Sequence, residues 1–331
     1  MAINLLEVKP HVVSRDLSGY ITFIYGAPKT GKTTMATQMP GSLLLAFEKG
    51  YNAIPGVYAQ DVNTWGEMKQ IYRELKKPEV KEVYKSIIVD TVDIAADLCQ
   101  RYICNQLGIE NIGDGGWTTN GWAKYKKEFE EVFRGLTMLG YAVFFISHEG
   151  DKTSKVKGTN EEYTQITPTV QSSALKIIEN MADIYGYVHN AIDPADGTKK
   201  VMMKLRSDDD SVRCGCRFKE IEPEIVFSYD NLVDKITKAI DEEAKLTDNK
   251  FVTDERMIVK EEVAYDYDAL MTEFKTLVEK LMQANQSNAS KITAIVDKYL
   301  GKGKKVGDTT PAQAEIINLI VEEIKSDLIN S

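Results

Sequence analysis

A short glycine-rich segment constrains the fold of this chain more than any other part of its sequence. Residues 26–34 read GAPKTGKTT, directly after the apolar run YITFIY at 20–25 and at the start of a segment at 32–39 with helical character. Two glycines separated by four residues and followed by Lys-Thr form the Walker A pattern, which requires a strand before it and a helix after it. The glycines let backbone N–H groups face phosphate oxygens, and the helix start adds partial positive charge. The segment therefore predicts a nucleotide-binding loop in an α/β fold.

Individual residues of the loop and of a second strand have expected roles in binding ATP and its metal ion. Lys32 is expected to reach the β- and γ-phosphates of ATP, and the Thr33 hydroxyl is expected to coordinate Mg²⁺. The run SIIVD at 86–90 has the form of a Walker B strand, with Asp90 holding the metal ion through water. The structural alternative for the loop is an ordinary glycine turn, and the alternative for 86–90 is a buried strand ended by a capping Asp. The residues predicted to surround the nucleotide are Gly26, Ala27, Pro28, Lys29, Thr30, Gly31, Lys32, Thr33 and Thr34.

Apolar runs elsewhere alternate between strand and helix lengths. Strands are expected at 43–47, 86–90 and 141–147, and helices at about 92–107 and 122–138. This alternation predicts a mainly parallel sheet with helices on both faces. The later runs DIYGYVHN, KKVMMKLR and VRCGCRF are separated by turn residues, so they predict short strands at an antiparallel edge.

Four regions follow from these patterns. Residues 1–18 are a lead-in segment and 19–230 the ATPase core. Residues 231–263 are expected to be an acidic helical linker, with a tether at about 245–262. Apolar residues at helical spacing predict a C-terminal helical module at 264–331.

Composition and charge exclude several classes of protein. No apolar run reaches the roughly 18 residues that span a bilayer, and the N-terminus lacks the apolar core of a signal peptide, so a cytosolic protein without membrane contact is expected. The spacing of the four cysteines fits neither a zinc site nor a secreted disulfide framework. The net charge is −9, but residues 221–268 hold 14 acidic against 6 basic residues. The remainder is close to neutral, so a basic, nucleic-acid-binding face stays possible.

These motifs, in this order, resemble a RecA-fold ATPase, and in particular the phage-encoded nucleotide-binding proteins of the Sak recombinase group, relatives of RadB and the Rad recombinases. The resemblance covers roughly residues 15–220. In that family the Walker A loop is followed by a glutamate at a strand end, the Walker B Asp and a polar sensor after a further strand. Glu48 at the end of LLLAFE, Asp90, and His148 after AVFFIS match this order. RecA itself has Gln at the sensor position.

The resemblance implies catalytic roles for further residues. Glu48 would activate water, since no glutamate directly follows Asp90, and His148 would sense the γ-phosphate. Lys204 and Arg206, in a Lys-x-Arg at the end of KKVMMKLR, would reach the γ-phosphate of a neighbouring subunit, which implies a homo-oligomer, either a ring or a filament. The structural alternatives are a solvated carboxylate for Glu48, a strand-capping polar residue for His148 and a solubilising basic edge strand for Lys204 and Arg206.

Two segments are candidates for contact with single-stranded DNA. The loop GDGGWTTNGW at 113–122 carries Trp117, which could stack on an unpaired base. The segment 151–170 follows His148 and has three lysines near its start, Lys152, Lys155 and Lys157. Both segments are also consistent with ordinary surface loops. The turn GKGKK at 301–305 could bind phosphates or be a solvated basic turn.

The first functional hypothesis is a Mg-ATP-dependent protein that binds and anneals single-stranded DNA in phage recombination, in the bacterial host cytoplasm. The second is a helicase-like or helicase-loading ATPase of phage replication, since that group shares the core and the Lys-x-Arg strand. The third is a non-catalytic, nucleotide-dependent scaffold whose helical tail recruits a partner such as a single-strand DNA-binding protein.

Overall fold

The structure, a computed structural model, describes residues 5–155, 162–192, 197–207, 211–248, 250–256 and 265–328. The chain divides into two compact units. One is Pro10–Glu261, and the other combines Met1–Lys9 with Glu262–Ser331.

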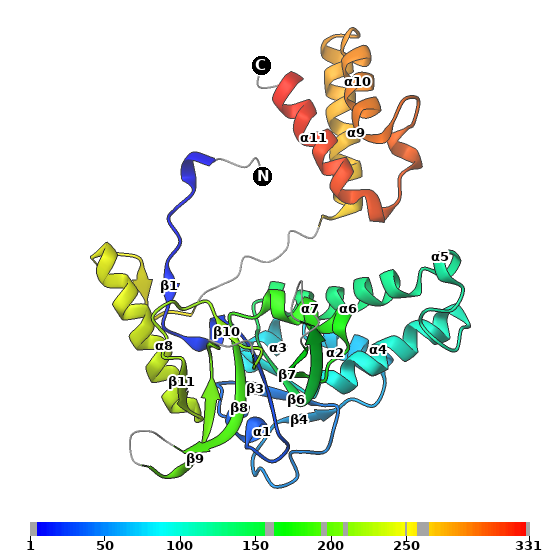
Figure 1. Cartoon of the computed structure of the whole chain (residues 1–331). Helices are drawn as coiled ribbons and strands as arrows, with labels where there is room; N and C mark the ends of the chain where they lie inside the picture. Colours follow the sequence, from blue (N-terminus) through cyan, green and yellow to red (C-terminus); the bar gives the residue numbers. More distant parts are fainter. Residues whose placement is uncertain are drawn as a thin grey trace. The chain divides into compact units, whose positions relative to one another are not determined.

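The larger unit is built around one extended sheet (Figure 1). Its strands follow the spatial order β11-β9-β8-β2-β6-β5-β3-β4. The six from β8 to β4 are parallel to their neighbours, while β9 and β11 extend the sheet as an antiparallel edge. The strand bounds are β2 Ile21–Gly26, β3 Ser42–Ala46, β4 Ala59–Asp61, β5 Ser86–Asp90, β6 Ala142–Lys155, β8 Ile184–Ile192, β9 Lys199–Lys204 and β11 Glu224–Val226.

The strand order places the two nucleotide motifs on either side of a third strand. The glycine loop follows β2 and Asp90 ends β5, and β6 lies between these strands. The resulting core is a RecA-like P-loop fold. The predicted α/β class, mainly parallel sheet, antiparallel edge and helical C-terminal region are thereby confirmed.

Helices cover both faces of the sheet because each face is apolar. The core of one face includes side chains of four helices, and that of the other face side chains of two. On the first face, the rings of Trp65, Phe129 and Phe133 pack against one another, with the centroid of Phe129 6.1 Å from that of Trp65 and 4.7 Å from that of Phe133. The helices are α2 Trp65–Glu74, α4 Val92–Leu107, α6 Gly121–Met138 and α7 Ser172–Met181 on the first face, and α1 Lys32–Ala36 and α8 Tyr229–Ala244 on the second.

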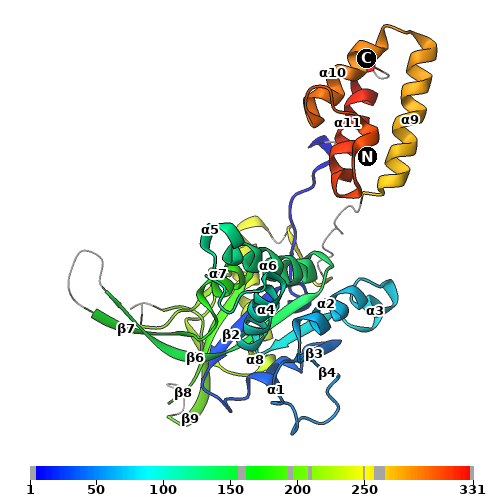
Figure 2. The same cartoon turned by 90° about the vertical axis from the view of Figure 1, so that its right-hand side faces the viewer.

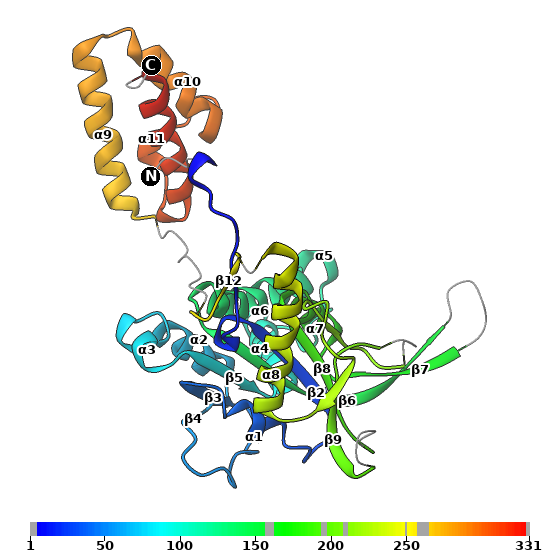
Figure 3. The ribbon, with the colours of Figure 1, turned by 90° about the vertical axis from the view of Figure 1, so that its left-hand side faces the viewer.

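Helix α8 differs from the expected linker. Its apolar residues Leu232, Ile236 and Ile240 are buried in the core of the second face. The charge of this segment faces outward while a stripe at helical spacing packs on the sheet, as an amphipathic helix requires. Figure 3 shows α8 running along the sheet.

The chain beyond α8 also stays with the core. Strand β12 (Val252–Thr253) pairs in parallel with β1 (Val13–Ser14), close to the start of the unit. Arg256 donates to the carbonyl oxygens of Ser18, Lys85 and Gly140. The described residues of the expected tether, 245–248 and 250–256, therefore belong to the core unit.

The second unit contains a three-helix module. Its core is formed by apolar side chains that include Leu270, Ile295, Ile317, Ile320 and Ile324. Each side chain of this size contributes about 1.5–3 kcal/mol when fully buried. The helices are α9 Tyr267–Ala284, α10 Asn288–Leu300 and α11 Ala314–Leu328.

Short elements complete the described chain. The short helices are η1 Leu5–Glu7, η2 Leu17–Gly19, α3 Pro78–Val83, α5 Gly116–Thr119, η3 Lys245–Thr247, η4 Val306–Asp308 and η5 Pro311–Gln313. The short strand β10, Gly215–Cys216, pairs with β8. Within the described residues, none of the helices combines the length and the apolar character that crossing a bilayer would need.

Candidate nucleotide-binding site

The glycine loop needs glycine at two positions for different reasons. A Cβ on Gly26 would lie 2.0 Å from the carbonyl oxygen of Val188 on β8, so no side chain fits there. Gly31 has φ 85°, in the left-handed region, and precedes the first turn of α1. The close packing of β2 on β8 and the turn into α1 fix the path of the loop.

Lys32 is held inside this loop. The residue is 5% exposed, and its ammonium group donates to the carbonyl oxygens of Gly26 at 2.7 Å and Ala27 at 2.8 Å. Burial lowers the pKa of Lys32, and the carboxylate of Asp90 opposes that shift. A buried cation at the mouth of a loop is suited to binding phosphate oxygens.

Thr33 and Asp90 meet across the gap between α1 and β5. The Thr33 hydroxyl donates to Asp90 Oδ2 at 2.7 Å. Burial raises the pKa of Asp90 to about 6, and the hydrogen bond from Thr33 counteracts part of this effect. Among the described residues, the Asp90 side chain contacts Thr33 but forms no ion pair, so a divalent cation would favour its ionised form.

The oxygens around Gly50 fit a Mg²⁺ ion that arrives with a nucleotide. A Cβ on Gly50 would lie 3.6 Å from Glu48 Oε1 and 3.8 Å from both Asp90 Oδ2 and Thr33 Oγ1. Three oxygens thus face one small space, and oxygen is the ligand that Mg²⁺ prefers. The described residues contain no cluster of three His, Cys, Asp or Glu side chains able to hold a metal alone. Thr33 and Asp90 would therefore hold Mg²⁺ together with phosphate oxygens and water, and the ion would neutralise phosphate charge there.

Glu48 and His148 lie together although 100 residues separate them. His148 Nε2 is 3.4 Å from Glu48 Oε2. The hydrogen bond to His148 lowers the pKa of Glu48, and the same contact raises the pKa of His148. Glu48 is thus held ionised beside the cavity, as a base that activates water must be.

These side chains line one cavity of about 310 Å³. Its only cationic side chains are Lys29, Lys32 and His148, so no arginine reaches it from the described residues. The lining residues are Pro28, Lys29, Gly31, Lys32, Thr33, Thr34, Glu48, Gly50, Asp90, Ile146 and His148.

Lys204 and Arg206 lie outside this cavity. Lys204 is the last residue of β9 and pairs with Tyr187 and Glu224 on the neighbouring strands. Arg206 follows the strand end, so strand alternation does not relate the two side chains. The Arg206 guanidinium donates to the carbonyl oxygens of Phe218 at 2.7 Å and Lys219 at 2.8 Å. Neither side chain acts on the nucleotide of its own subunit in this arrangement, and action across an interface stays a prediction.

The segment after His148 is a long hairpin rather than a loop. Strand β6 continues through Lys155 and pairs antiparallel with β7 (Glu162–Pro168). Figure 2 shows this hairpin extending beyond the sheet. Lys152 lies exposed on β6, and Lys155 is its last residue. The predicted DNA residue Lys157 lies outside the described residues.

Trp117 lies on α5, a short helix within the predicted glycine-rich loop. Its side chain is 99% exposed. The neighbouring glycines, with Trp117 and Trp122, line a shallow depression of about 240 Å³. An aromatic ring this exposed is available for stacking.

A hydrogen-bond network that sequence reasoning missed links the cavity to the hairpin. Asp93, in the first turn of α4, accepts hydrogen bonds from the hydroxyls of Ser147 and Thr169. The Thr169 backbone N–H donates to the carbonyl oxygen of His148 at 3.0 Å. Asp93 stands three residues after Asp90, but nothing in the sequence marks Thr169 as its partner.

Comparison with known proteins identifies the family of the chain. Residues 18–213 match the family model described as AAA domain. The chain is 31% identical over 333 residues to a protein of Bacillus subtilis (strain 168) named SPbeta prophage-derived uncharacterized protein YorG, covering 98% of each chain.

Among solved structures, the chain is similar to a KaiC-like protein from the hyperthermophilic archaeon Pyrococcus horikoshii OT3. The sequence identity is 15%, the TM-score is 0.32, and the match covers 57% of this chain and 79% of the other.

Proposed function

The chain belongs to the AAA domain family of P-loop ATPases, and we propose that it hydrolyses Mg-ATP to control a grip on single-stranded DNA during phage recombination. Lys32, Thr33 and Asp90 bind Mg-ATP, and Glu48 activates the attacking water. The similarity to a prophage-derived protein supports the phage context and a site of action in the bacterial cytoplasm.

One observation carries the proposal. His148, which contacts Glu48, lies on the same strand β6 that continues into the exposed hairpin. A change at the γ-phosphate that moves His148 is therefore transmitted along one strand to Lys152. Thr169, which directly follows β7, donates hydrogen bonds to Asp93 and to the His148 carbonyl oxygen, so β7 is held to the same point. Such a rigid element can couple nucleotide state to strand binding.

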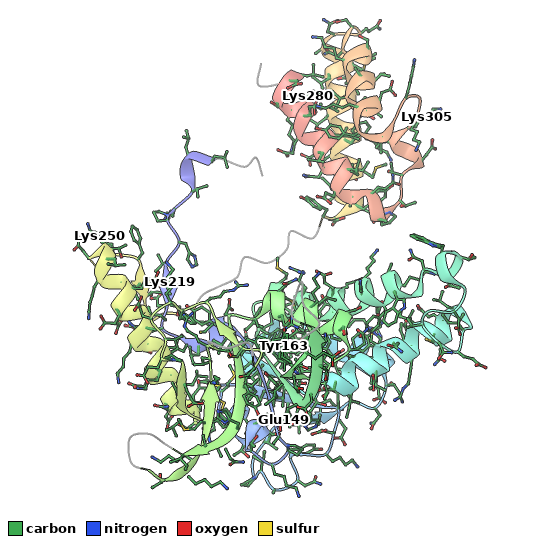
Figure 4. All side chains as sticks on the ribbon, in the orientation of Figure 1. Glu149, Tyr163, Lys219, Lys250, Lys280 and Lys305 are labelled. Carbon is green, nitrogen blue, oxygen red and sulfur yellow. The ribbon has the colours of Figure 1, made fainter. Side chains whose placement is uncertain are left out.

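The hairpin also offers suitable chemistry. Lys152 is exposed on β6, and Tyr163 on β7 is 36% exposed (Figure 4). A lysine that contacts phosphate and an aromatic ring that stacks on a base are the combination used to bind single strands without sequence preference. Trp117 is proposed as a second stacking residue. The active form is a homo-oligomer in which Lys204 acts on the neighbouring nucleotide.

The ATPase rate with and without an unstructured oligonucleotide tests this function. We expect stimulation of about tenfold or more in the wild type, and its loss in the double variant Lys152→Ala/Tyr163→Ala. The basal rate should be unchanged because neither residue lines the nucleotide cavity. Lys76→Ala/Tyr58→Ala, which removes the same side-chain types far along the chain, is the matched control. Equal rates with and without DNA would refute the proposal.

A nucleotide-dependent scaffold is the second candidate, and one observation favours it. Arg206 is engaged by the carbonyl oxygens of Phe218 and Lys219, and no arginine among the described residues lines the cavity. ATP binding without turnover at any protein concentration would support the scaffold, with the helical module recruiting a single-strand DNA-binding protein.

A further inference from the structure

The three-helix module separates its charges along the sequence. Residues 275–305 contain seven lysines and two acidic residues, whereas residues 306–328 contain one lysine and five acidic residues. Helix α9 as a whole has two lysines and three acidic residues, so the excess of positive charge is concentrated in α10 and, above all, in the turn that follows it. In a chain with a net charge of −9, such a local excess is needed before a polyanion can bind.

The turn at residues 301–305 (GKGKK) holds three of these lysines in a fixed backbone. Gly301 and Gly303 have φ of 95° and 79°, in the left-handed region. The Gly303 N–H donates to Asp297 Oδ1 at 2.8 Å, and the Lys304 N–H donates to the Gly301 carbonyl oxygen. Val306, directly after the turn, is 5% exposed and packs in the core of the module. Both ends of the turn are thus anchored.

The lysines of the turn differ from others in the module in their partners. Lys298 is paired with Glu323, and Lys325 is paired with Glu273 and Glu322. For the exposed side chains of Lys302, Lys304 and Lys305, the described chain offers neither an ion pair nor a hydrogen bond. Figure 4 shows Lys305 at the periphery of the helices. Three ammonium groups within four residues therefore remain available to an external anion.

We infer that this turn is a second nucleic-acid-binding site, which contacts the phosphates of single-stranded DNA through Lys302, Lys304 and Lys305. The inference rests on the proposed function and assigns a ligand to the C-terminal module. Nucleic acid is favoured over a single anion because three lysines on a short turn match a row of phosphates. Because the module and the core belong to one chain, DNA held by the turn raises the effective concentration of DNA at the hairpin.

The test is the affinity of the full-length chain for a fluorescein-labelled oligothymidylate at several salt concentrations. The triple variant Lys302→Ala/Lys304→Ala/Lys305→Ala should bind about tenfold more weakly at low salt. Removal of three phosphate contacts should also reduce the slope of log affinity against log salt by about 2, at roughly 0.7 per contact for single strands. The corresponding triple Lys→Arg variant keeps the charges and should retain wild-type affinity.

A matched control removes the same charge elsewhere. Lys238, Lys245 and Lys250 are each paired with an acidic side chain of the core unit, and their triple Ala variant should bind DNA like the wild type. An equal loss of affinity in this control would overturn the inference, since net charge alone would then explain both. The turn follows the C-terminus of α10, where lysines can also stabilise the helix. A lower melting temperature with unchanged DNA affinity would show that helix stabilisation is their only role.

Competition experiments distinguish nucleic acid from an acidic protein or a single phosphate ion as the ligand of the turn. Polyglutamate that displaces the oligonucleotide from the wild type, but not from the turn variant, would indicate an acidic protein partner and overturn the nucleic-acid assignment. Inorganic phosphate at an equal phosphate concentration should not displace it. If the wild type binds DNA and the turn variant matches it, only this inference fails; if the wild type binds no DNA, the proposed function fails with it.

Discussion

Two cavities lie at opposite ends of the parallel strands and differ in kind. The nucleotide cavity, about 310 Å³, is at the carboxyl ends, after Gly26 and Asp90. A larger cavity of about 530 Å³ is at the amino ends, beside Tyr20 and Asp183, which directly precede β2 and β8. Cavity volume therefore does not identify the end of the sheet at which the nucleotide motifs lie.

The two cavities also differ in how their polar side chains are arranged. In the larger one, Asp183 accepts a hydrogen bond from the Ile21 N–H and pairs with Arg217 at 3.1 Å. Its aromatic walls, including Tyr20 and Phe218, belong to the packing between α8 and the sheet. In the smaller cavity, oxygens of Glu48, Asp90 and Thr33 converge on one space. Convergent groups that a ligand can still satisfy indicate the functional site.

The largest effect is expected from a substitution of Glu48 in the nucleotide cavity. Glu48→Gln should lower ATP turnover by about 10²-fold or more, because it removes a general base while keeping the size of the side chain. The affinity for ATP should stay within a few-fold of the wild type, since Lys32, Thr33 and Asp90 are untouched. Turnover and equilibrium binding of a fluorescent ATP analogue measure the two effects. Wild-type turnover in this variant would assign the base to another residue.

A pH series sharpens the role of Asp90. Its pKa is raised to about 6, chiefly by burial, so the carboxylate becomes protonated as the pH falls through this value. Protonation removes an oxygen ligand of Mg²⁺, and the affinity for Mg-ATP should fall about tenfold for each pH unit below 6. Titrations of the wild type between pH 5 and 8 measure this effect.

Asp90→Asn is the control for the pH series. The variant should bind Mg-ATP weakly at pH 8 and lose the step near pH 6, because the amide does not titrate. A step of the same size in both proteins would assign the titration to another group.

The smallest effect is expected at the larger cavity. The Tyr20 hydroxyl donates to the Ser14 carbonyl oxygen at 2.7 Å, and the side chain is buried. Tyr20→Phe should cost about 1 kcal/mol in the free energy of unfolding and leave ATP turnover unchanged. Thermal denaturation should show a decrease of roughly 2–4 °C. Reduced turnover with unchanged stability would mean that the amino-terminal cavity influences the chemistry.

Much of the core could be predicted from local patterns. The apolar run SIIVD matches β5, and the helix expected at 92–107 coincides with α4. Both predictions succeed because strand and helix periodicity are properties of consecutive residues. The pattern gave a helix from about residue 231, but the acidic composition of α8 concealed the apolar stripe that packs it on the sheet. It also gave no sign that β6 extends to Lys155 as one arm of a hairpin.

The sequence alone determined the glycine loop, the order of the motifs and the α/β class, because each depends on residues adjacent in the chain. Only the tertiary structure brought His148 to Glu48 across 100 residues and Thr169 to Asp93 across 76. Strand order decides such contacts, and it depends on which apolar faces pack together rather than on any local signal. The same packing engaged Arg206 with two backbone carbonyl oxygens, which the spacing Lys-x-Arg could not reveal.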